Sequence, residues 1–289
     1  MTAQGFKTEL ECLPCFHRQI ERTLAYAGIN GDRGRRIRRM AGAEVEAAKL
    51  DEVPARTSTR IHRILNREIG VDAYMRVKDQ YNRIALEKLD ELRKRAAAAG
   101  DRLEGCVRAA IAGNVIDFGI YEKIDLDRAI EDAFLTALTA TDYTAFTSAV
   151  SRARRVLYLC DNAGEIVFDR ILVEALRAAG RELIVAVKGS PVINDATLDD
   201  ADIAGLASCA EIIDNGNDGI GTLLEACSAR FRDAFLSADL IISKGQANFE
   251  TLVEIGDERI FFLFKVKCPV VARGLNRENG EIVLMQGRK

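Results

Sequence analysis

The chain has 289 residues, of which 48% are hydrophobic and 29% charged, as in a soluble globular protein with a substantial core. The net charge of −3 gives no general attraction to nucleic acid or to an anionic membrane, so neither is expected as a partner. No apolar run reaches the roughly 20 residues of a membrane helix, and no signal peptide is visible. Seven cysteines, an odd number, and two histidines predict a cytoplasmic protein without a disulfide framework or a multi-histidine metal centre.

The first half of the chain, residues 1–150, has the pattern of an all-helical domain, either a bundle or a cap. Apolar residues recur at spacings of three and four in segments 35–50, 73–100 and 101–114. Pro54 stands where a helix could begin, and Gly70 stands where one could end. We predict helices in this half and no strand.

The second half, residues 151–289, alternates apolar runs with helical stretches. The runs lie at 155–159, 182–187, 210–214, 238–243 and 259–264, and their near-continuous hydrophobicity suits strands covered on both faces. This alternation predicts an α/β fold with a doubly wound, mostly parallel sheet of the Rossmann type. A last run at 280–287 could add an edge strand.

Each of these five runs is followed by a segment that contains Asp, Asn, Lys or Gly. In an open parallel sheet such segments emerge together at the carboxyl edge, where ligands bind. Asp161, Asn162 and Asp195 offer oxygen donors, which suit Mg²⁺ or Mn²⁺ rather than a thiolate-binding metal. Lys244 and Lys267 offer ammonium groups that could neutralise phosphate oxygens. The pattern predicts a hard cation beside an anionic ligand.

A glycine-rich segment after the third strand fits the same interpretation. Gly216, Gly219 and Gly221 precede a predicted helix, whose N-terminal amides could receive an anion. Taken alone, a single loop is explained equally well by helix capping, by steric needs of a turn or by solvation. The agreement of all five loops favours a phosphate site over these local explanations.

Eight motifs in order along the chain also resemble one known family. They are ECLPCFHRQ (11–19), GVDAYMRVKDQYNRIAL (70–86), AGNVIDFG (112–119), CDNAGEIVFDRIL (160–172), VKGSPVINDAT (187–197), DNGNDGIGTLLE (214–225), ADLIISKGQANFETL (238–252) and LFKVKCPVVARGL (263–275). Over nearly the whole chain the sequence is similar to the damage-control phosphatases, once catalogued as domain-of-unknown-function family 89. The Cys-x-x-Cys pair near the N-terminus resembles the stand-alone microbial branch.

The resemblance implies a phosphatase that depends on a divalent metal ion, Mn, Mg, Co or Ni. Its substrates would be small phosphorylated metabolites, damaged or surplus, such as sugar phosphates, nucleotides or cofactor precursors. It assigns Asp161, Asn162 and Asp195 to the metal and to catalysis, with Lys267 contacting the phosphate as a further catalytic residue.

The same resemblance implies that the loop of Lys244, Gly245 and Asn248 lines the substrate. The chain departs from the sugar-phosphate branch in one place. The arginine of that branch's Arg-Thr-x-Lys motif is missing from the segment FKVK at 264–267, so specificity for sugar phosphates is not transferred.

Several further residues have two interpretations. Asn114, Asp117, Lys78 and Asn82 could reach the substrate from the helical half, although helix capping and solvation explain the same residues equally well. Gly219 and Gly221, in the loop after the third strand, are further candidates for substrate binding. Glu165 is either a base candidate or an exposed glutamate in the first turn of a helix.

The Cys-x-x-Cys pair, Cys12 and Cys15, could supply half of a zinc or iron–sulfur site, or could be a pair of reduced thiols.

Two other functions compete with a phosphatase. One is an S-adenosylmethionine-dependent carboxyl methyltransferase, and the other is a non-catalytic module that binds a metal or metabolite. The turn after the first strand is acidic and amide-bearing rather than multiply glycine-rich, which disfavours the methyltransferase. Direct attack by water is favoured over an aspartyl-phosphate because the motif Asp-x-Asp-x-Thr is absent.

Overall fold

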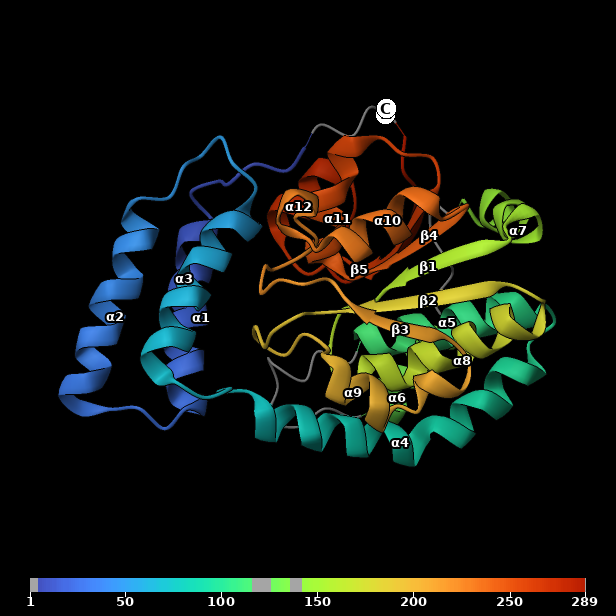
Figure 1. Ribbon diagram of the computed structural model, residues 1–289, viewed down its shortest axis with the longest axis horizontal. Coiled ribbons are helices and arrows are strands. Elements are labelled where there is room, and N and C mark those ends of the chain that lie inside the picture. Colours follow the sequence, from blue (N-terminus) through green and yellow to red (C-terminus); the bar gives the residue numbers. More distant parts are fainter. Residues whose placement is uncertain (1–4, 116–125, 136–141, 289) are drawn as a thin grey trace.

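The computed structural model describes residues 5–115, 126–135 and 142–288 (Figure 1). The helices are α1 (Cys12–Tyr26), α2 (Gly31–Glu46), α3 (Pro54–Ile69), α4 (Met75–Ala98), α5 (Arg102–Val115), α6 (Leu126–Leu135), α7 (Tyr143–Arg152), α8 (Glu165–Ala178), α9 (Leu198–Ile203), α10 (Ala229–Ser237), α11 (Gln246–Leu252) and α12 (Pro269–Leu275). The strands are β1 (Arg155–Leu159), β2 (Glu182–Val187), β3 (Glu211–Asp214), β4 (Leu240–Lys244), β5 (Ile260–Lys265) and β6 (Ile282–Gln286).

The six strands form one sheet in the order β3-β2-β1-β4-β5-β6. Strands β1 to β5 run parallel, and β6 pairs antiparallel with β5 at the edge. The expected α/β fold with a doubly wound, mostly parallel sheet is therefore confirmed, including the edge strand. The order reverses between β1 and β4, and such a switch point opens a crevice at the carboxyl ends of the two strands.

Helices cover both faces of the sheet, which explains why its strands are so apolar. Successive residues of a strand point to opposite faces. In β1, Val156 and Tyr158 belong to one hydrophobic core, and Leu157 and Leu159 belong to the other. The first core lies under α4 to α9, and the second lies under α10 to α12 (Figure 1).

Helices α1 to α3 form a separate bundle with a core of its own. Phe16, Ile20, Ile37, Ile61 and Leu65 are among its buried side chains. Helices α4 to α7, in contrast, bury their apolar faces in the first core of the sheet. The predicted division at residue 150 therefore marks a change of secondary structure and does not separate two cores.

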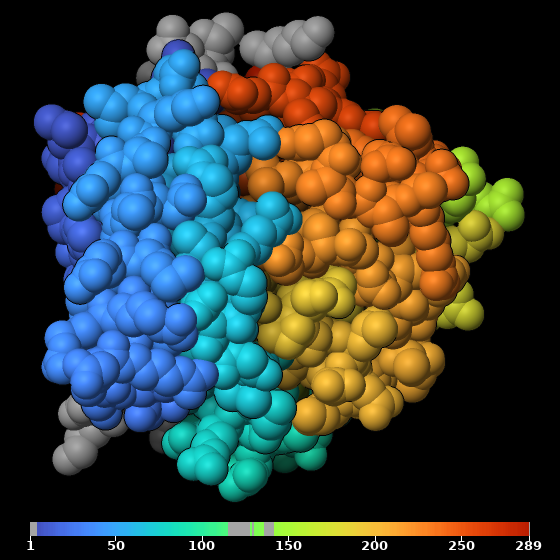
Figure 2. Space-filling view, turned by 60° about the vertical axis from the view of Figure 1, so that its left-hand side comes forward, coloured from blue at the N-terminus to red at the C-terminus, as the bar shows by residue number. Residues whose placement is uncertain are grey.

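Helix α3 lies across the carboxyl edge of the sheet. The hydroxyl of Thr59 accepts a hydrogen bond from the amide of Ile220 at 3.0 Å, and the side-chain amide of Asn66 donates to a carbonyl in the loop after β2. Local sequence limits the helix, because Pro54 occupies its first turn and Gly70 caps its end with a φ of 81°. Figure 2 shows the blue and cyan surface of the N-terminal helices directly against the yellow and orange surface of the C-terminal half.

No helix among the described residues is long and apolar enough to cross a membrane.

Candidate functional site

The loops that follow β1 and β2 pair with each other beyond the ends of the strands. Asn162 and Asp195 face one another in an antiparallel bridge. The amide of Ala196 donates to the carbonyl of Asp161 at 2.8 Å, which extends this pairing. The backbone thus brings together the three residues that sequence analysis assigned to a metal, at the switch point of the sheet.

Asp161 is buried, with 8% of its surface exposed. Its Oδ2 accepts hydrogen bonds from the amides of Asn162 at 2.7 Å and Asn114 at 3.2 Å, whereas its Oδ1 accepts none within the described part of the chain. Burial raises the pKa of Asp161 well above its usual range, and the nearby carboxylates of Glu165 and Asp195 raise it further. One carboxylate oxygen is therefore fixed, and the other remains available to a ligand.

Gly245, which follows β4, packs against this carboxylate. A Cβ atom at Gly245 would stand 2.1 Å from the carboxyl carbon of Asp161, and the φ of 82° also favours glycine. The residue is thus required so that the carboxylate can sit against the backbone. The structure gives Gly245 this packing role, and its contact with substrate stays a prediction.

Asp195 is equally buried, with 7% of its surface exposed. Its Oδ2 lies 3.4 Å from the ammonium of Lys188, a residue that sequence analysis did not select. Burial raises the pKa of Asp195, while Lys188 acts in the opposite direction. The signal that could have found Lys188 was its position, because it comes directly after a buried strand.

Lys244 lies beneath the site, and its ammonium does not point into it. The ammonium is fully buried, 2.5 Å from Glu165 Oε1 and 2.9 Å from the carbonyl of Ala110, and it also pairs with Asp169. Burial alone would lower its pKa, but Asp169 and Glu165 raise it overall. The expectation that Lys244 contacts substrate phosphate is therefore corrected, since its donors are already occupied by the protein.

Glu165 and Asp169 complete this buried ionic network. Glu165 is only 1% exposed and accepts from the side-chain amide of Asn114 at 2.9 Å, so it is not the solvated first-turn glutamate considered above. Asp169 accepts from the hydroxyl of Tyr158 at 2.7 Å. Burial raises the pKa of Asp169 to about 7, against the opposing effect of Lys244.

Asn114 links the helical half of the chain to the site. Besides Asp161 and Glu165, which accept from its amide nitrogen, its Oδ1 accepts from the backbone amide of Lys265 at 2.8 Å. With 1% of its surface exposed, the side chain is committed to the protein. Asn114 therefore orients Asp161, and the structure does not support the expected contact with substrate.

Asn248 is also committed to the protein. Its amide nitrogen donates to the carbonyl of Lys244 at 2.8 Å and to that of Cys160 at 3.2 Å, and its oxygen accepts from the hydroxyl of Thr222. These bonds tie together the ends of β1 and β4 and the loop after β3. The family-based expectation of a substrate contact is replaced by a role in joining three loops.

The glycine-rich loop after β3 does not lead into a helix as expected. A 3₁₀ turn of three residues, Leu224–Ala226, follows it, and α10 begins only at Ala229. The carbonyls of Gly219 and Gly221 accept hydrogen bonds from Lys188, while the amide of Gly219 donates to the side chain of Asn217. The predicted anion site at a helix N-terminus is therefore wrong, because the loop presents carbonyls to a buried cation.

Lys267 follows β5 at the same edge. Its backbone amide donates to the side chain of Gln246 at 2.8 Å, and its positive charge lowers the pKa of Asp161. The ammonium is therefore close enough to Asp161 to influence the site. Asp117, the remaining predicted substrate residue, lies outside the described residues.

The donor set fits a hard divalent cation. Asp161 and Asp195 are buried carboxylates with raised pKa values, and each has one oxygen without a hydrogen bond in the described part of the chain. A cation would relieve the cost of burying their charge. Asn162 turns its amide nitrogen to Asp161 here, and rotation of that amide would present its oxygen instead.

No group of three or more His, Cys, Asp or Glu side chains in the described ranges could hold a metal by itself. A metal at this edge would accordingly need the amide oxygen of Asn162 and ligands from outside the protein. Cys12 and Cys15 are free cysteines and do not belong to such a group among the described residues either. Burial raises the pKa of Cys12 to about 11, which favours the interpretation as reduced thiols.

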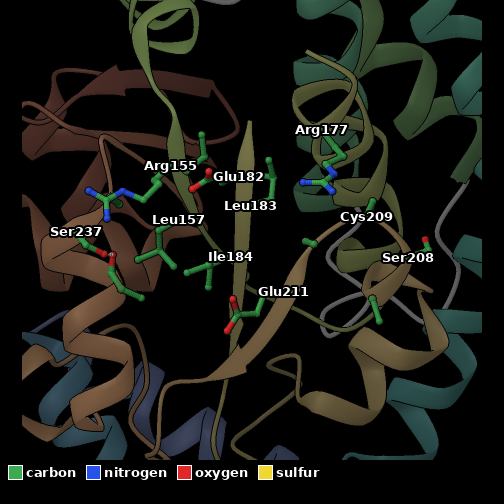
Figure 3. A pocket seen from close by; sticks show the side chains of 15 residues that line it. Arg155, Leu157, Arg177, Glu182, Leu183, Ile184, Ser208, Cys209, Glu211 and Ser237 are labelled. Atoms are coloured by element: carbon green, nitrogen blue, oxygen red, sulfur yellow. Dashed lines mark hydrogen bonds between the residues drawn. The ribbon is translucent and has the colours of Figure 1, made fainter. Parts of the chain in front are cut away.

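A cavity of about 440 Å³ lies at the opposite edge of the sheet (Figure 3). Its lining includes Arg155, Glu182 and Glu211, which stand at the amino ends of β1, β2 and β3. None of the predicted site residues lines it. Because ligands of such sheets bind at the carboxyl ends of the strands, we place the candidate site at the switch point and not in this cavity.

Comparison with known proteins gives the family of the chain. Residues 8–283 match the damage-control phosphatase ARMT1-like domain. The chain belongs to this family. A damage-control phosphatase of Pyrococcus horikoshii is 37% identical over 287 residues, which cover 98% of this chain and 99% of that protein. A damage-control phosphatase of Archaeoglobus fulgidus is 32% identical over 235 residues, which cover 80% of this chain and 82% of that protein.

A solved structure supports the same relationship. The crystal structure of a DUF89 family protein from Pyrococcus horikoshii superimposes with a TM-score of 0.90 at 36% sequence identity, and the match covers 98% of this chain and 99% of that chain. The resemblance stated from the motifs is therefore confirmed. Membership of the damage-control phosphatase family, together with relatives that carry this name, supports a phosphatase role.

Proposed function

We propose that this member of the damage-control phosphatase family hydrolyses phosphomonoesters of small metabolites with a divalent metal ion held by Asp161, Asn162 and Asp195. The observation that carries the proposal is the state of the two aspartates. Each has one oxygen fixed by the protein and one oxygen left without a partner in the described residues, and the two meet across a backbone bridge. Mn²⁺, Mg²⁺, Co²⁺ and Ni²⁺ are the candidate ions, since all accept oxygen ligands.

The bound ion would supply Lewis-acid stabilisation of a phosphoryl oxygen. The other tasks belong to the chain itself. Lys267, whose charge already acts on Asp161, would bind a negatively charged phosphate oxygen. Asn114 and Gly245 keep the carboxylate of Asp161 in one orientation, which limits the reorganisation needed when substrate binds. We favour water as the nucleophile.

The proposed substrates are small phosphorylated metabolites such as sugar phosphates, nucleotides or cofactor precursors. The lack of the arginine at 264–267 leaves no reason to prefer sugar phosphates within this class. We also propose that the protein is located in the cytoplasm.

The first test replaces Asp161 by Asn, which keeps the shape of the side chain and removes its charge. We expect the hydrolysis of p-nitrophenyl phosphate in the presence of Mn²⁺ to fall by about 100-fold or more, because a metal ligand is lost. Asp233→Asn is the matched control, since it removes the same charge from an exposed position on α10. Undiminished activity in Asp161→Asn, or full activity of the wild type after chelation, contradicts the proposal.

The same preparations separate the two rival functions. Calorimetric binding of S-adenosylmethionine without release of phosphate would favour the methyltransferase. Tight binding of Mn²⁺ without turnover of any compound in a panel of phosphorylated sugars, nucleotides and cofactor fragments would favour a non-catalytic module.

A further inference from the structure

We infer that Lys188 is a positioning residue of the metal site, which orients Asp195 and fixes the turn at Gly219 and Gly221. The inference rests on the proposed function, because it concerns the same site. Neither the motif analysis nor the comparisons with known proteins assign a role to this lysine.

The ammonium of Lys188 makes two hydrogen bonds and one ion pair. The ammonium donates to the carbonyl of Gly219 at 2.8 Å and to that of Gly221, and it lies 3.4 Å from Oδ2 of Asp195. Only 4% of the residue is exposed. Because the ammonium is buried, donates to two carbonyls and faces Asp195 with its remaining charge, we expect Lys188 to act through these partners and not on a phosphate directly.

The charge of Lys188 would be costly at this depth without a partner. Asp195 is the carboxylate that neutralises it, while the two carbonyls satisfy its other hydrogens. The arrangement therefore has to be kept as a unit. Withdrawing Asp195 would leave a buried cation, and withdrawing Lys188 would leave a buried carboxylate.

The backbone strengthens this unit. The amide of Lys188 donates to the carbonyl of Ala196 at 2.9 Å, so the lysine stands at the closing pair of the loop that carries Asp195. The side chain and the main chain of one residue thus hold the base of the loop and its functional carboxylate. The unpartnered oxygen of Asp195 is fixed in direction because the other oxygen is bound.

Lys244 provides an internal contrast. It is the last residue of a buried strand and is also buried, but its partners are Glu165 and Asp169, beneath the site. The two lysines accordingly have different tasks. Lys188 acts on a residue proposed to bind the metal, and Lys244 neutralises carboxylates in the layer below.

The test is the substitution Lys188→Met, which keeps the length of the side chain and removes its charge and its donors. We expect Mn²⁺ to bind about 10- to 100-fold more weakly by isothermal titration calorimetry, as when the partner of a metal-binding residue is lost. Lys94→Met, at an exposed position on α4, should leave the affinity unchanged. Thermal unfolding without metal reports whether each variant is folded.

The outcomes distinguish this inference from the proposed function. If the wild type binds no Mn²⁺, the proposed function fails. If the wild type binds Mn²⁺ and folded Lys188→Met binds it equally well or more tightly, the positioning role is overturned and the proposed function stands. Should Lys188→Met not fold, Lys188→Gln keeps a neutral amide donor group at a similar volume, and the same comparison decides. In a background of Asp195→Asn, removing Lys188 should have no further effect on Mn²⁺ affinity.

Discussion

The buried imidazole of His62 predicts a defined loss of stability in acid. His62 lies on α3 with 1% of its surface exposed, and neither ring nitrogen has a hydrogen-bond partner in the described part of the chain. Burial lowers its pKa from 6.5 to about 4. Between these two values the unfolded chain binds a proton that the folded protein excludes, so the free energy of unfolding decreases as the pH falls from 6.5 towards 4.

The size of the effect follows from the two values. A difference between 6.5 and about 4, at about 1.4 kcal/mol for each pH unit, gives about 3 kcal/mol for the complete window. This is a large share of the roughly 5–15 kcal/mol that stabilises a typical domain. Other groups also titrate in this range, including Asp169, whose raised pKa of about 7 works in the opposite direction. The test is therefore the difference in pH dependence between the wild type and a variant that lacks the imidazole of His62.

The assay is urea unfolding followed by circular dichroism at several pH values between 7.5 and 4.5. We expect the free energy of unfolding of His62→Leu to decrease less than that of the wild type as the pH falls. The difference in free energy of unfolding between variant and wild type should therefore grow towards low pH. His17→Leu is the control, because it removes an exposed histidine and keeps His62. Parallel pH profiles of wild type and His62→Leu would refute the reasoning, since they would mean that His62 accepts its proton in the folded state.

Two further substitutions test the packing beneath the site. Gly245→Ala should lower phosphatase activity by about 100-fold and destabilise the fold by about 1–3 kcal/mol. The reason is that the added Cβ would overlap the carboxylate of Asp161, in a backbone conformation that favours glycine. Gly100→Ala is the control, because its added atom meets open space, and it should change neither activity nor the urea midpoint. Lys244→Met should destabilise the protein by about 3–5 kcal/mol in the same unfolding assay, because Glu165 and Asp169 would remain buried without their cation. A variant as stable as Lys94→Met would show that these carboxylates are neutral in the native protein.

The positions of the strands could be predicted because they depend on local pattern. Fully buried strands leave near-continuous apolar runs, and the parallel topology alone places the segment after each run at the carboxyl edge. This is why Asp161, Asn162 and Asp195 could be named together before any contact was known. The antiparallel bridge between Asn162 and Asp195 confirms that their loops meet.

The direction of each side chain could not be predicted in this way. Lys188 directly follows a buried strand and Lys244 ends one, yet Lys188 pairs with Asp195 at the site and Lys244 pairs with Glu165 and Asp169 below it. The choice depends on which carboxylates lie within reach once the helices have packed. Asn114 was likewise assigned to substrate, whereas the packing of α5 on α8 commits its amide to Asp161 and Glu165.

The sequence by itself determined where the strands lie, that they run parallel, and which polar residues follow them at one edge of the sheet. These features follow from the spacing of hydrophobic residues and from the direction of the chain. Only the tertiary structure decided which polar groups face a ligand and which neutralise each other in the interior. Electrostatic pairing depends on distances of a few ångströms between residues that are far apart in the chain. Lys244 and Glu165 show this most directly: they are 79 residues apart in the chain, and Nζ of Lys244 lies 2.5 Å from Oε1 of Glu165.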